Sequence, residues 1–306
     1  MESTREIVVE NLIKKYPGGV TAVNGVSFHV KAGEIFGFLG PNGAGKSTTI
    51  KILTTLGLPS DGKATVGGYD VVSEAENVRR IAGVALQEIG IDPMMKSVEL
   101  LSMQSQLFGA TRKEAVARAN ELIELVQLTG AVNRRVGTYS GGMRRRLDLA
   151  MALVHKPDIL FLDEPTTGLD PASRRDIWTE VRRLNRQMGM TIFLTTQYLE
   201  EADELADMIA IINQGQIAAE GTPQKLKASL GTEAINLAFD TPDQALQAQT
   251  IVASMAVSSS SQGSPRRAAS SISTWRSTTA VVALCKGLAL SRCCGSSAAR
   301  GRTSRW

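Results

Sequence analysis

The segment from Gly40 to Ser47 reads Gly-Pro-Asn-Gly-Ala-Gly-Lys-Ser and is well suited to holding a phosphate group. It fits the pattern G-x-x-x-x-G-K-[ST], and it follows an apolar segment and precedes a helix-forming one. Glycines let the backbone curl so that successive N–H groups point at phosphate oxygens, and a helix amino end adds partial positive charge. We expect Lys46 to neutralise the β- and γ-phosphates of a nucleoside triphosphate and the Ser47 hydroxyl to ligate Mg²⁺.

A pair of acidic residues supplies the second half of this chemistry. Asp163 and Glu164 follow the apolar run Ile159 to Leu162, so their carboxylates emerge at the carboxyl end of a strand, where ligands bind in open α/β sheets. We expect Asp163 to be a Mg²⁺ partner, directly or through water. Glu164 suits a general base or a residue that positions the attacking water.

The elements around these residues predict an α/β fold. Continuous apolar runs between polar residues are typical of strands buried on both faces of a parallel sheet, and a helix between two of them makes a βαβ unit. Apolar spacing predicts a helical layer over about 97–127 and a hairpin around Asn213-Gln214-Gly215. The expected strands are 7–9, 26–30, 34–39, 158–163, 191–195, 208–212 and 216–219, and the expected helices are 46–56 and 172–188.

A second glycine-containing helix start lies before the acidic pair. Tyr139-Ser140-Gly141-Gly142-Met143, here called the signature loop, opens an apolar-periodic segment. It resembles the Leu-Ser-Gly-Gly-Gln signature of ATP-binding cassette (ABC) proteins, with Tyr139 in place of Leu and Met143 in place of Gln. The resemblance covers roughly residues 5–225. It implies a P-loop NTPase cassette with a RecA-like mixed parallel sheet core, an N-terminal antiparallel β subdomain and a helical signature subdomain.

The resemblance also implies roles for residues outside the two main motifs. Tyr16 matches the aromatic residue that stacks on adenine, Gln87 the loop that senses Mg²⁺ and contacts the membrane partner, and Asp170 the end of a dimer-contact loop. Gln197 stands where the family usually has a His that contacts the γ-phosphate. The residues expected to contact ATP are Tyr16, Gly40, Pro41, Asn42, Gly43, Ala44, Gly45, Lys46, Ser47, Thr48, Gln87, Ser140, Gly141, Gly142, Asp163 and Asp170.

Three side chains are expected to bind the metal, and three are expected to take part in the hydrolysis reaction. Ser47, Gln87 and Asp163 are the Mg²⁺ candidates, while Glu164, Lys46 and Gln197 are the catalytic candidates. Because the amide of Gln197 donates a hydrogen bond but does not become cationic near neutral pH, we expect intact but slow hydrolysis.

Gln197 and the run from Tyr139 to Ala150 look like the daunorubicin/doxorubicin-resistance branch of bacterial drug exporters. This resemblance implies an ATPase subunit on the cytoplasmic face of the membrane, two copies of which sandwich ATP and energise a separate integral membrane permease. The cargo implied is a drug or hydrophobic, anthracycline-like metabolite. The alternative is a soluble cassette ATPase that acts on nucleic acid or ribosomes, although such proteins usually carry tandem cassettes, coiled-coil insertions or zinc-binding Cys.

Charge is distributed unevenly along the chain. The 306 residues include 34 Lys+Arg and 30 Asp+Glu, yet residues 258–306 hold seven Arg, one Lys and no acid. Residues 1–257 therefore have 26 basic and 30 acidic side chains, and the positive balance gives no support to a nucleic-acid partner. No apolar run is long enough to span a membrane, and no signal peptide is expected.

The composition also predicts the domain organisation. We expect an ABC nucleotide-binding domain over 5–225, with its helical subdomain at about 90–155, followed by a partial C-terminal extension over 226–257. Residues 258–306 contain 13 Ser and all three Cys and lose all periodicity. We interpret them as a basic, low-complexity, disordered tail, and we hypothesise that a shifted reading frame produced it.

Overall fold

A computed structural model describes residues 4–86, 91–229, 235–238 and 281–284 of the chain. The chain divides into two units, residues 1–226 and residues 227–306. Among the described residues of the second unit, strands β11 (Ile235–Ala238) and β12 (Val281–Leu284) pair antiparallel. The remaining residues of the expected extension and tail, from 230 on, lie outside the described residues.

The first unit is built around a six-stranded sheet with the order β10-β9-β3-β8-β7-β6. Strands β9, β3, β8, β7 and β6 run parallel, and only β10 runs antiparallel to its neighbour. The mixed parallel sheet predicted from the sequence is therefore confirmed. The strands are β3 (Ile35–Leu39), β6 (Ala82–Ala85), β7 (Ile159–Asp163), β8 (Thr191–Thr196), β9 (Met208–Asn213) and β10 (Gln216–Gly221).

An antiparallel sheet packs against this core, as predicted for the amino-terminal part. Its order is β2-β1-β4-β5, and the strands are β1 (Ile7–Lys15), β2 (Thr21–Val30), β4 (Asp61–Val66) and β5 (Tyr69–Asp70). Five phenylalanine rings join the two sheets, with centroids 5.3 to 5.8 Å apart: Phe28, Phe36, Phe38, Phe161 and Phe193. Burial of such large apolar groups is the main favourable contribution to folding here.

Several helices lie between the strands or follow them in the part of the chain that the structure describes. Helix α1 (Lys46–Leu53) follows β3, and the long helix α6 (Pro171–Met188) connects β7 to β8. Asp170 caps α6 at its start, Pro171 occupies its first turn and Gly189 ends it in a left-handed conformation, which are the usual signals for the two ends of a helix. The others are α2 (Ala75–Ile81), α7 (Leu199–Leu205) and α8 (Pro223–Ser229).

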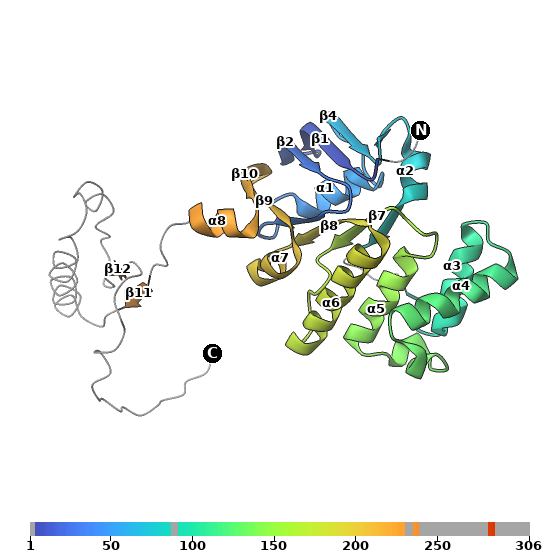
Figure 1. The fold of residues 1–306 in the computed structure, drawn as a ribbon. Helices are drawn as coiled ribbons and strands as arrows, with labels where there is room; N and C mark the ends of the chain where they lie inside the picture. The colour runs from blue at the N-terminus through green and yellow to red at the C-terminus, as the bar shows by residue number, and fades with distance from the viewer. Residues whose placement is uncertain (1–3, 87–90, 230–234, 239–280, 285–306) are drawn as a thin grey trace, which may run out of the picture. The chain divides into compact units, whose positions relative to one another are not determined.

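The helical layer consists of α3 (Ser97–Leu107), α4 (Arg112–Leu125) and α5 (Gly141–Ala152), with 3₁₀ turns at Thr129–Ala131 and Val136–Thr138 (Figure 1, green). The region predicted as helical over 97–127 is two helices. Gly109 breaks it with φ 92°, and Thr111 and Glu114 form a capping box that starts α4. None of the helices among the described residues is long and apolar enough to cross a bilayer.

Candidate functional site

The phosphate loop, Gly40 to Ser47, connects the carboxyl end of β3 to the amino end of α1. Gly45 has φ 112°, and a Cβ at this position would lie 2.4 Å from the carbonyl oxygen of Ala22. No other residue type fits this close approach of the loop to β2. Gly215, in the turn between β9 and β10, donates its N–H to the Ala44 carbonyl (3.0 Å) and supports the loop from the other side.

The side chain of Lys46 is 4% exposed and lies inside the loop that it belongs to. Its ammonium group donates to the carbonyl oxygens of Gly40 (2.8 Å) and Pro41 (3.0 Å) and forms an ion pair with Glu164 Oε1 (3.1 Å). A buried cation at the start of a helix, facing a glycine-rich loop, is a strong electrostatic site for phosphate. The structure thus brings the lysine predicted to bind phosphate and the expected general base together.

Asp163 and Glu164 end β7 and are both buried, at 4% and 7% exposure. Asp163 Oδ1 accepts a hydrogen bond from Thr195 Oγ1 (2.5 Å) and lies 3.4 Å from Ser47 Oγ. The two oxygens expected to ligate Mg²⁺ therefore lie side by side, although β7 and α1 are far apart in the sequence. Hard oxygen donors of this kind match the ligand preference of Mg²⁺.

Glu164 adopts a left-handed backbone conformation, with φ 47°. Its N–H donates to Thr195 Oγ1 (3.1 Å), and its Oε2 accepts from Thr167 Oγ1 (3.1 Å). A non-glycine residue with positive φ costs about 1 to 3 kcal/mol, which its surroundings must offset, and such residues cluster at functional sites. The two threonines and the Lys46 ammonium hold Glu164 in place.

The signature loop exposes two of its residues, Ser140 and Gly141, on the surface of the molecule. Ser140 is exposed and caps α5 by accepting from the Met143 N–H (3.3 Å). A Cβ on Gly142 would lie 2.9 Å from Ser173 Oγ, so this position packs tightly against the first turn of α6. Tyr139, which stands in place of the family's Leu, is buried, and its hydroxyl donates to the Ala131 carbonyl (2.9 Å).

Three of the other expected residues lie among the described residues, on separate elements. Tyr16 is 41% exposed, with the Lys14 ammonium 5.2 Å from its ring centroid, and Gln197 follows β8 and is half-buried. Asp170 accepts from Ser173 Oγ (2.6 Å) and from the N–H groups of Ala172 and Ser173, which lower its pKa. Its observed contacts are those of a helix cap. Gln87 lies outside the described residues.

Sequence reasoning missed three charged residues near the acidic pair, of which Arg145 and Glu201 are buried and Asp148 is partly buried. Arg145, in the second turn of α5, is 4% exposed, and burial lowers its pKa while the carboxylate of Asp148 opposes this. Burial also raises the pKa of Asp148 to about 6 and raises the pKa of Glu201. The three-residue spacing of Arg145 and Asp148 on one helix face was the signal available in the sequence.

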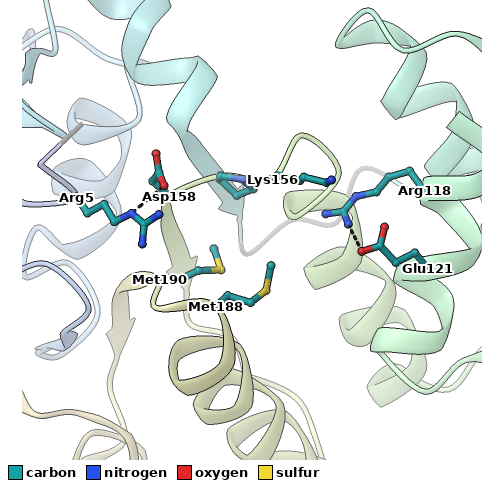
Figure 2. A pocket seen from close by; sticks show the side chains of 8 residues that line it. Arg5, Arg118, Glu121, Lys156, Asp158, Met188 and Met190 are labelled. Carbon is teal, nitrogen blue, oxygen red and sulfur yellow. Dashed lines mark ion pairs between the residues drawn. The ribbon is translucent and has the colours of Figure 1, made fainter. Parts of the chain in front are cut away.

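The two ends of strand β7 each lie beside a cavity, and the residues that line the two cavities differ. A cavity of about 540 Å³ at the carboxyl end is lined by residues that include Gly141, Arg145, Glu164 and Thr167. A second, of about 320 Å³, lies at the amino end, beside Asp158 (Figure 2). The arginines there already pair with carboxylates, Arg5 with Asp158 (2.9 Å) and Arg118 with Glu121 (2.7 Å). Only the carboxyl end collects the residues expected to act on a nucleotide, among those that the structure describes.

Comparison with known proteins identifies the family. The family model described as ABC transporter matches residues 23–167. The daunorubicin/doxorubicin resistance ATP-binding protein DrrA of Streptomyces peucetius is 48% identical over 251 residues, which make up 82% of this chain and 76% of that protein. The chain belongs to the ABC transporter family. It is an ABC ATPase, and its phosphate loop and acidic pair lie in the nucleotide-binding fold of that family.

Further relatives agree with this assignment. The linearmycin resistance ATP-binding protein LnrL of Bacillus subtilis (strain 168) is 44% identical over 226 residues, covering 74% of this chain and 72% of that protein. A solved dimeric ATP-binding cassette in a post-hydrolysis state, bound to ADP and Pi, has a TM-score of 0.65 at 25% identity. That likeness covers 71% of this chain and 98% of the cassette. The predicted cassette fold is therefore confirmed.

Proposed function

We propose that this chain is the ATP-hydrolysing subunit of an exporter for a drug or hydrophobic, anthracycline-like metabolite. It would act on the cytoplasmic face of the membrane beside a separate permease. The observation that carries the ATPase chemistry is the buried group of Lys46, Asp163 and Glu164 at the phosphate loop, with Lys46 and Glu164 3.1 Å apart. The names of the relatives, which are resistance ATP-binding proteins, support the choice of cargo.

The roles of the side chains follow from charge and position. Lys46 binds the β- and γ-phosphates and neutralises the charge that develops during phosphoryl transfer, and Glu164 takes a proton from the attacking water. Gln197 donates an amide hydrogen bond toward the γ-phosphate. Ser47 Oγ and Asp163 Oδ1 would hold Mg²⁺, which when bound supplies positive charge to the phosphate oxygens.

The metal would depend strongly on the nucleotide itself. Among the described residues, no group of three or more His, Cys, Asp or Glu is arranged to hold a metal ion. This pattern suits Mg²⁺, which binds through one or two protein ligands plus phosphates and water. The resemblance adds Gln87 as a further ligand and as the contact to the permease.

A homodimer would complete the site. Each ATP would lie between the phosphate loop of one chain and the signature loop of its partner, so that ATP joins the two copies and hydrolysis releases them. The exposed Ser140 and Gly141 and the likeness to a dimeric cassette support this arrangement. Tyr16 would stack on the adenine and Asp170 would lie near the contact between the copies.

Replacing Glu164 with Gln tests the assignment. The carboxamide keeps the size of the side chain and an acceptor for Thr167 but is not a base, so phosphate release should fall about 100-fold or more while ATP binding persists. Size-exclusion chromatography with ATP and Mg²⁺ should then show a stable dimer. Glu76→Gln is the matched control, because Glu76 is 73% exposed and, among the described residues, forms its ion pair with Arg80. A Glu164→Gln protein that stays monomeric with ATP while still turning over would refute the role of Glu164.

A soluble cassette ATPase acting on nucleic acid or ribosomes is the alternative function. Affinity purification of the full chain from detergent-solubilised cells separates the two. We expect a polytopic membrane protein to copurify, and cells that express both proteins should accumulate less daunorubicin than cells with the Glu164→Gln variant. Copurification of RNA without a membrane protein would favour the alternative.

A further inference from the structure

Arg145 is a charged side chain in the interior of the molecule, one helical turn after Ser140. It is 4% exposed, whereas Arg144 is exposed and Arg146 is half-buried. Burying a charge costs several kcal/mol, and an apolar side chain of similar volume usually stabilises a core as well or better. The position of Arg145 therefore needs an explanation beyond folding stability.

The donors of Arg145 reach three separate segments of the chain. Its Nε donates to the Pro165 carbonyl (2.9 Å), and its Nη2 donates to the Asp163 carbonyl (3.1 Å). Its Nη1 donates to the Leu86 carbonyl (2.8 Å) and to Asp148 Oδ2 (2.7 Å). Three of the four acceptors are backbone oxygens where strands end, and only the fourth is the carboxylate of an ion pair.

The acceptors bracket the functional residues. Asp163 and Pro165 stand on either side of Glu164, and Leu86 immediately precedes Gln87. Arg145 thus fixes the backbone on both sides of the expected general base and at the end of β6. A planar guanidinium with five N–H donors can satisfy these directions at once, and an ammonium cannot.

The segment after Glu164 is also held from its other side. Thr166 Oγ1 and Trp178 Nε1 both donate to Glu201 Oε1, at 2.9 and 3.1 Å. Glu201 is 1% exposed and is one of the carboxylates whose charge stabilises the cationic form of Arg145. The turn after β7 therefore lies between a buried cation on α5 and a buried carboxylate on α7.

We propose that Arg145 is a positioning residue for hydrolysis, which sets the backbone around Glu164 and ties it to the helix that carries the signature loop. Helix α5 begins at the signature loop, which in the proposed dimer contacts the nucleotide held by the partner's phosphate loop. About one turn further along α5, Arg145 contacts the backbone around Glu164 of its own chain. Arg145 thus links the nucleotide in one site to the catalytic carboxylate of the other. The inference rests on the proposed role of Glu164 and on the proposed ATP-bound dimer.

Replacing Arg145 with Met or Lys separates positioning from packing. Misplacing a catalytic group by about 1 Å costs about 100-fold in rate, so Arg145→Met should lower kcat about 30- to 100-fold with KM for ATP changed less than about threefold. Arg145→Lys should recover little of this loss, because the charge is kept and the three carbonyl contacts are not. Arg146→Met is the matched control: Arg146 lies on the same helix, and its ion pair within the described part of the chain is with Asp176 near the surface (2.6 Å).

Turnover is measured per folded molecule, well below the Tm of each variant. If Arg145→Met does not fold, the Arg145→Met, Asp148→Asn double variant removes the unpaired carboxylate, and Arg145→Lys provides an independent test. A kcat within about twofold of wild type, or a raised KM with unchanged kcat, would overturn the proposal. If Glu164→Gln stops hydrolysis while Arg145→Met does not, only this inference fails; if Glu164→Gln retains turnover, the proposed function fails first.

Discussion

The phosphate loop and the signature loop are both glycine-containing turns that open a helix, yet they differ in what surrounds them. The phosphate loop is enclosed: Lys46, Asp163 and Glu164 are all less than 10% exposed, and Ala44 is tied to the hairpin turn at Gly215. The signature loop is open, with Ser140 and Gly141 exposed and its tightest contact directed back toward α6. The difference supports the proposal that the phosphate loop works with groups of its own chain and that the signature loop is presented to a second copy.

The helix starts show the same contrast. Helix α5 is capped by Ser140, whose hydroxyl accepts from the Met143 N–H. Within the part of the chain that the structure describes, α1 has no side-chain cap at Gly45. An uncapped helix start leaves N–H groups for an anionic ligand. This difference supports the proposal that the phosphate loop contacts phosphate directly through its N–H groups.

The largest effect is expected in the phosphate loop itself. Lys46→Ala removes the buried cation, and loss of one group that stabilises transition-state charge costs about 100- to 1,000-fold in rate. Phosphate release should therefore fall by about that factor. Lys51→Ala, an exposed lysine on the same helix, is the control and should turn over as wild type does. Near-normal hydrolysis by Lys46→Ala would contradict the proposal that the phosphate loop carries the reaction.

A smaller loss is expected in the signature loop. In Gly142→Ala the new Cβ meets Ser173 Oγ at 2.9 Å, which shifts the loop, and we expect about a tenfold lower kcat. Gly130→Ala is the control, since a Cβ there has open space around it. A second change, Ser173→Gly, removes the clashing atoms and should restore part of the rate.

Mixing variants of the two loops sharpens the test. A dimer of one Lys46→Ala chain and one Gly142→Ala chain contains one site with both loops intact. Phosphate release by the mixture should exceed the sum of the two variants measured alone. No gain on mixing would mean that each chain completes its own site and that the second loop is not presented to a partner.

A change of only a few-fold in the rate of hydrolysis is expected at Gln197, which follows β8 and belongs to neither glycine-containing loop. Gln197→His introduces a side chain that becomes cationic below about pH 6.5 and exchanges protons. We expect hydrolysis about threefold faster than wild type at neutral pH, with a new dependence on pH between about 6 and 7. A His variant that is no faster and has the wild-type pH profile would show that this side chain does not limit turnover.

The smallest effect concerns the stability of the helix behind the signature loop. Burial raises the pKa of Asp148 from its ordinary 3.8 to about 6, with Arg145 opposing the shift. The folded state therefore binds more protons than the unfolded state between these values, so this group stabilises the fold at low pH and the contribution is lost as pH rises through about 6.

Asp148→Asn removes this dependence while keeping an acceptor for Arg145. Urea unfolding of the variant and of wild type between pH 4 and 7 measures it. We expect the variant to lack the fall in unfolding free energy between about pH 4 and 6 that Asp148 contributes to wild type. Parallel curves for the two proteins would show that Asp148 keeps its ordinary pKa in the folded protein.

The motif-bearing parts of the fold could be predicted because their signals are local. A buried run such as Ile159 to Leu162 fixes a strand and its acidic end, and Asp170-Pro171 and Gly189 mark the two ends of α6. Strand β4 and helices α2 and α7 were not predicted. They are short, and their stability comes from packing rather than from a periodic pattern.

The buried network around Arg145 was not predictable for a geometric reason. Arg144, Arg145 and Arg146 form one basic run in the sequence, but successive residues on a helix point about 100° apart, so only the middle one faces the core. Sequence cannot show that this side chain meets the carbonyl oxygens of Leu86, Asp163 and Pro165. The assigned roles of the site residues, Gln87 among them, stay predictions until the variants are measured.

The cluster of five phenylalanine rings affects hydrogen exchange in the strand beside the phosphate loop. It lies against β3, which is hydrogen-bonded between β8 and β9 and leads directly into the phosphate loop. Amide protons of such a strand exchange with solvent deuterium only when the whole unit unfolds, because local fraying would have to expose the rings. Their exchange rate thus reports the global stability of the ATPase from within a few residues of its reaction centre.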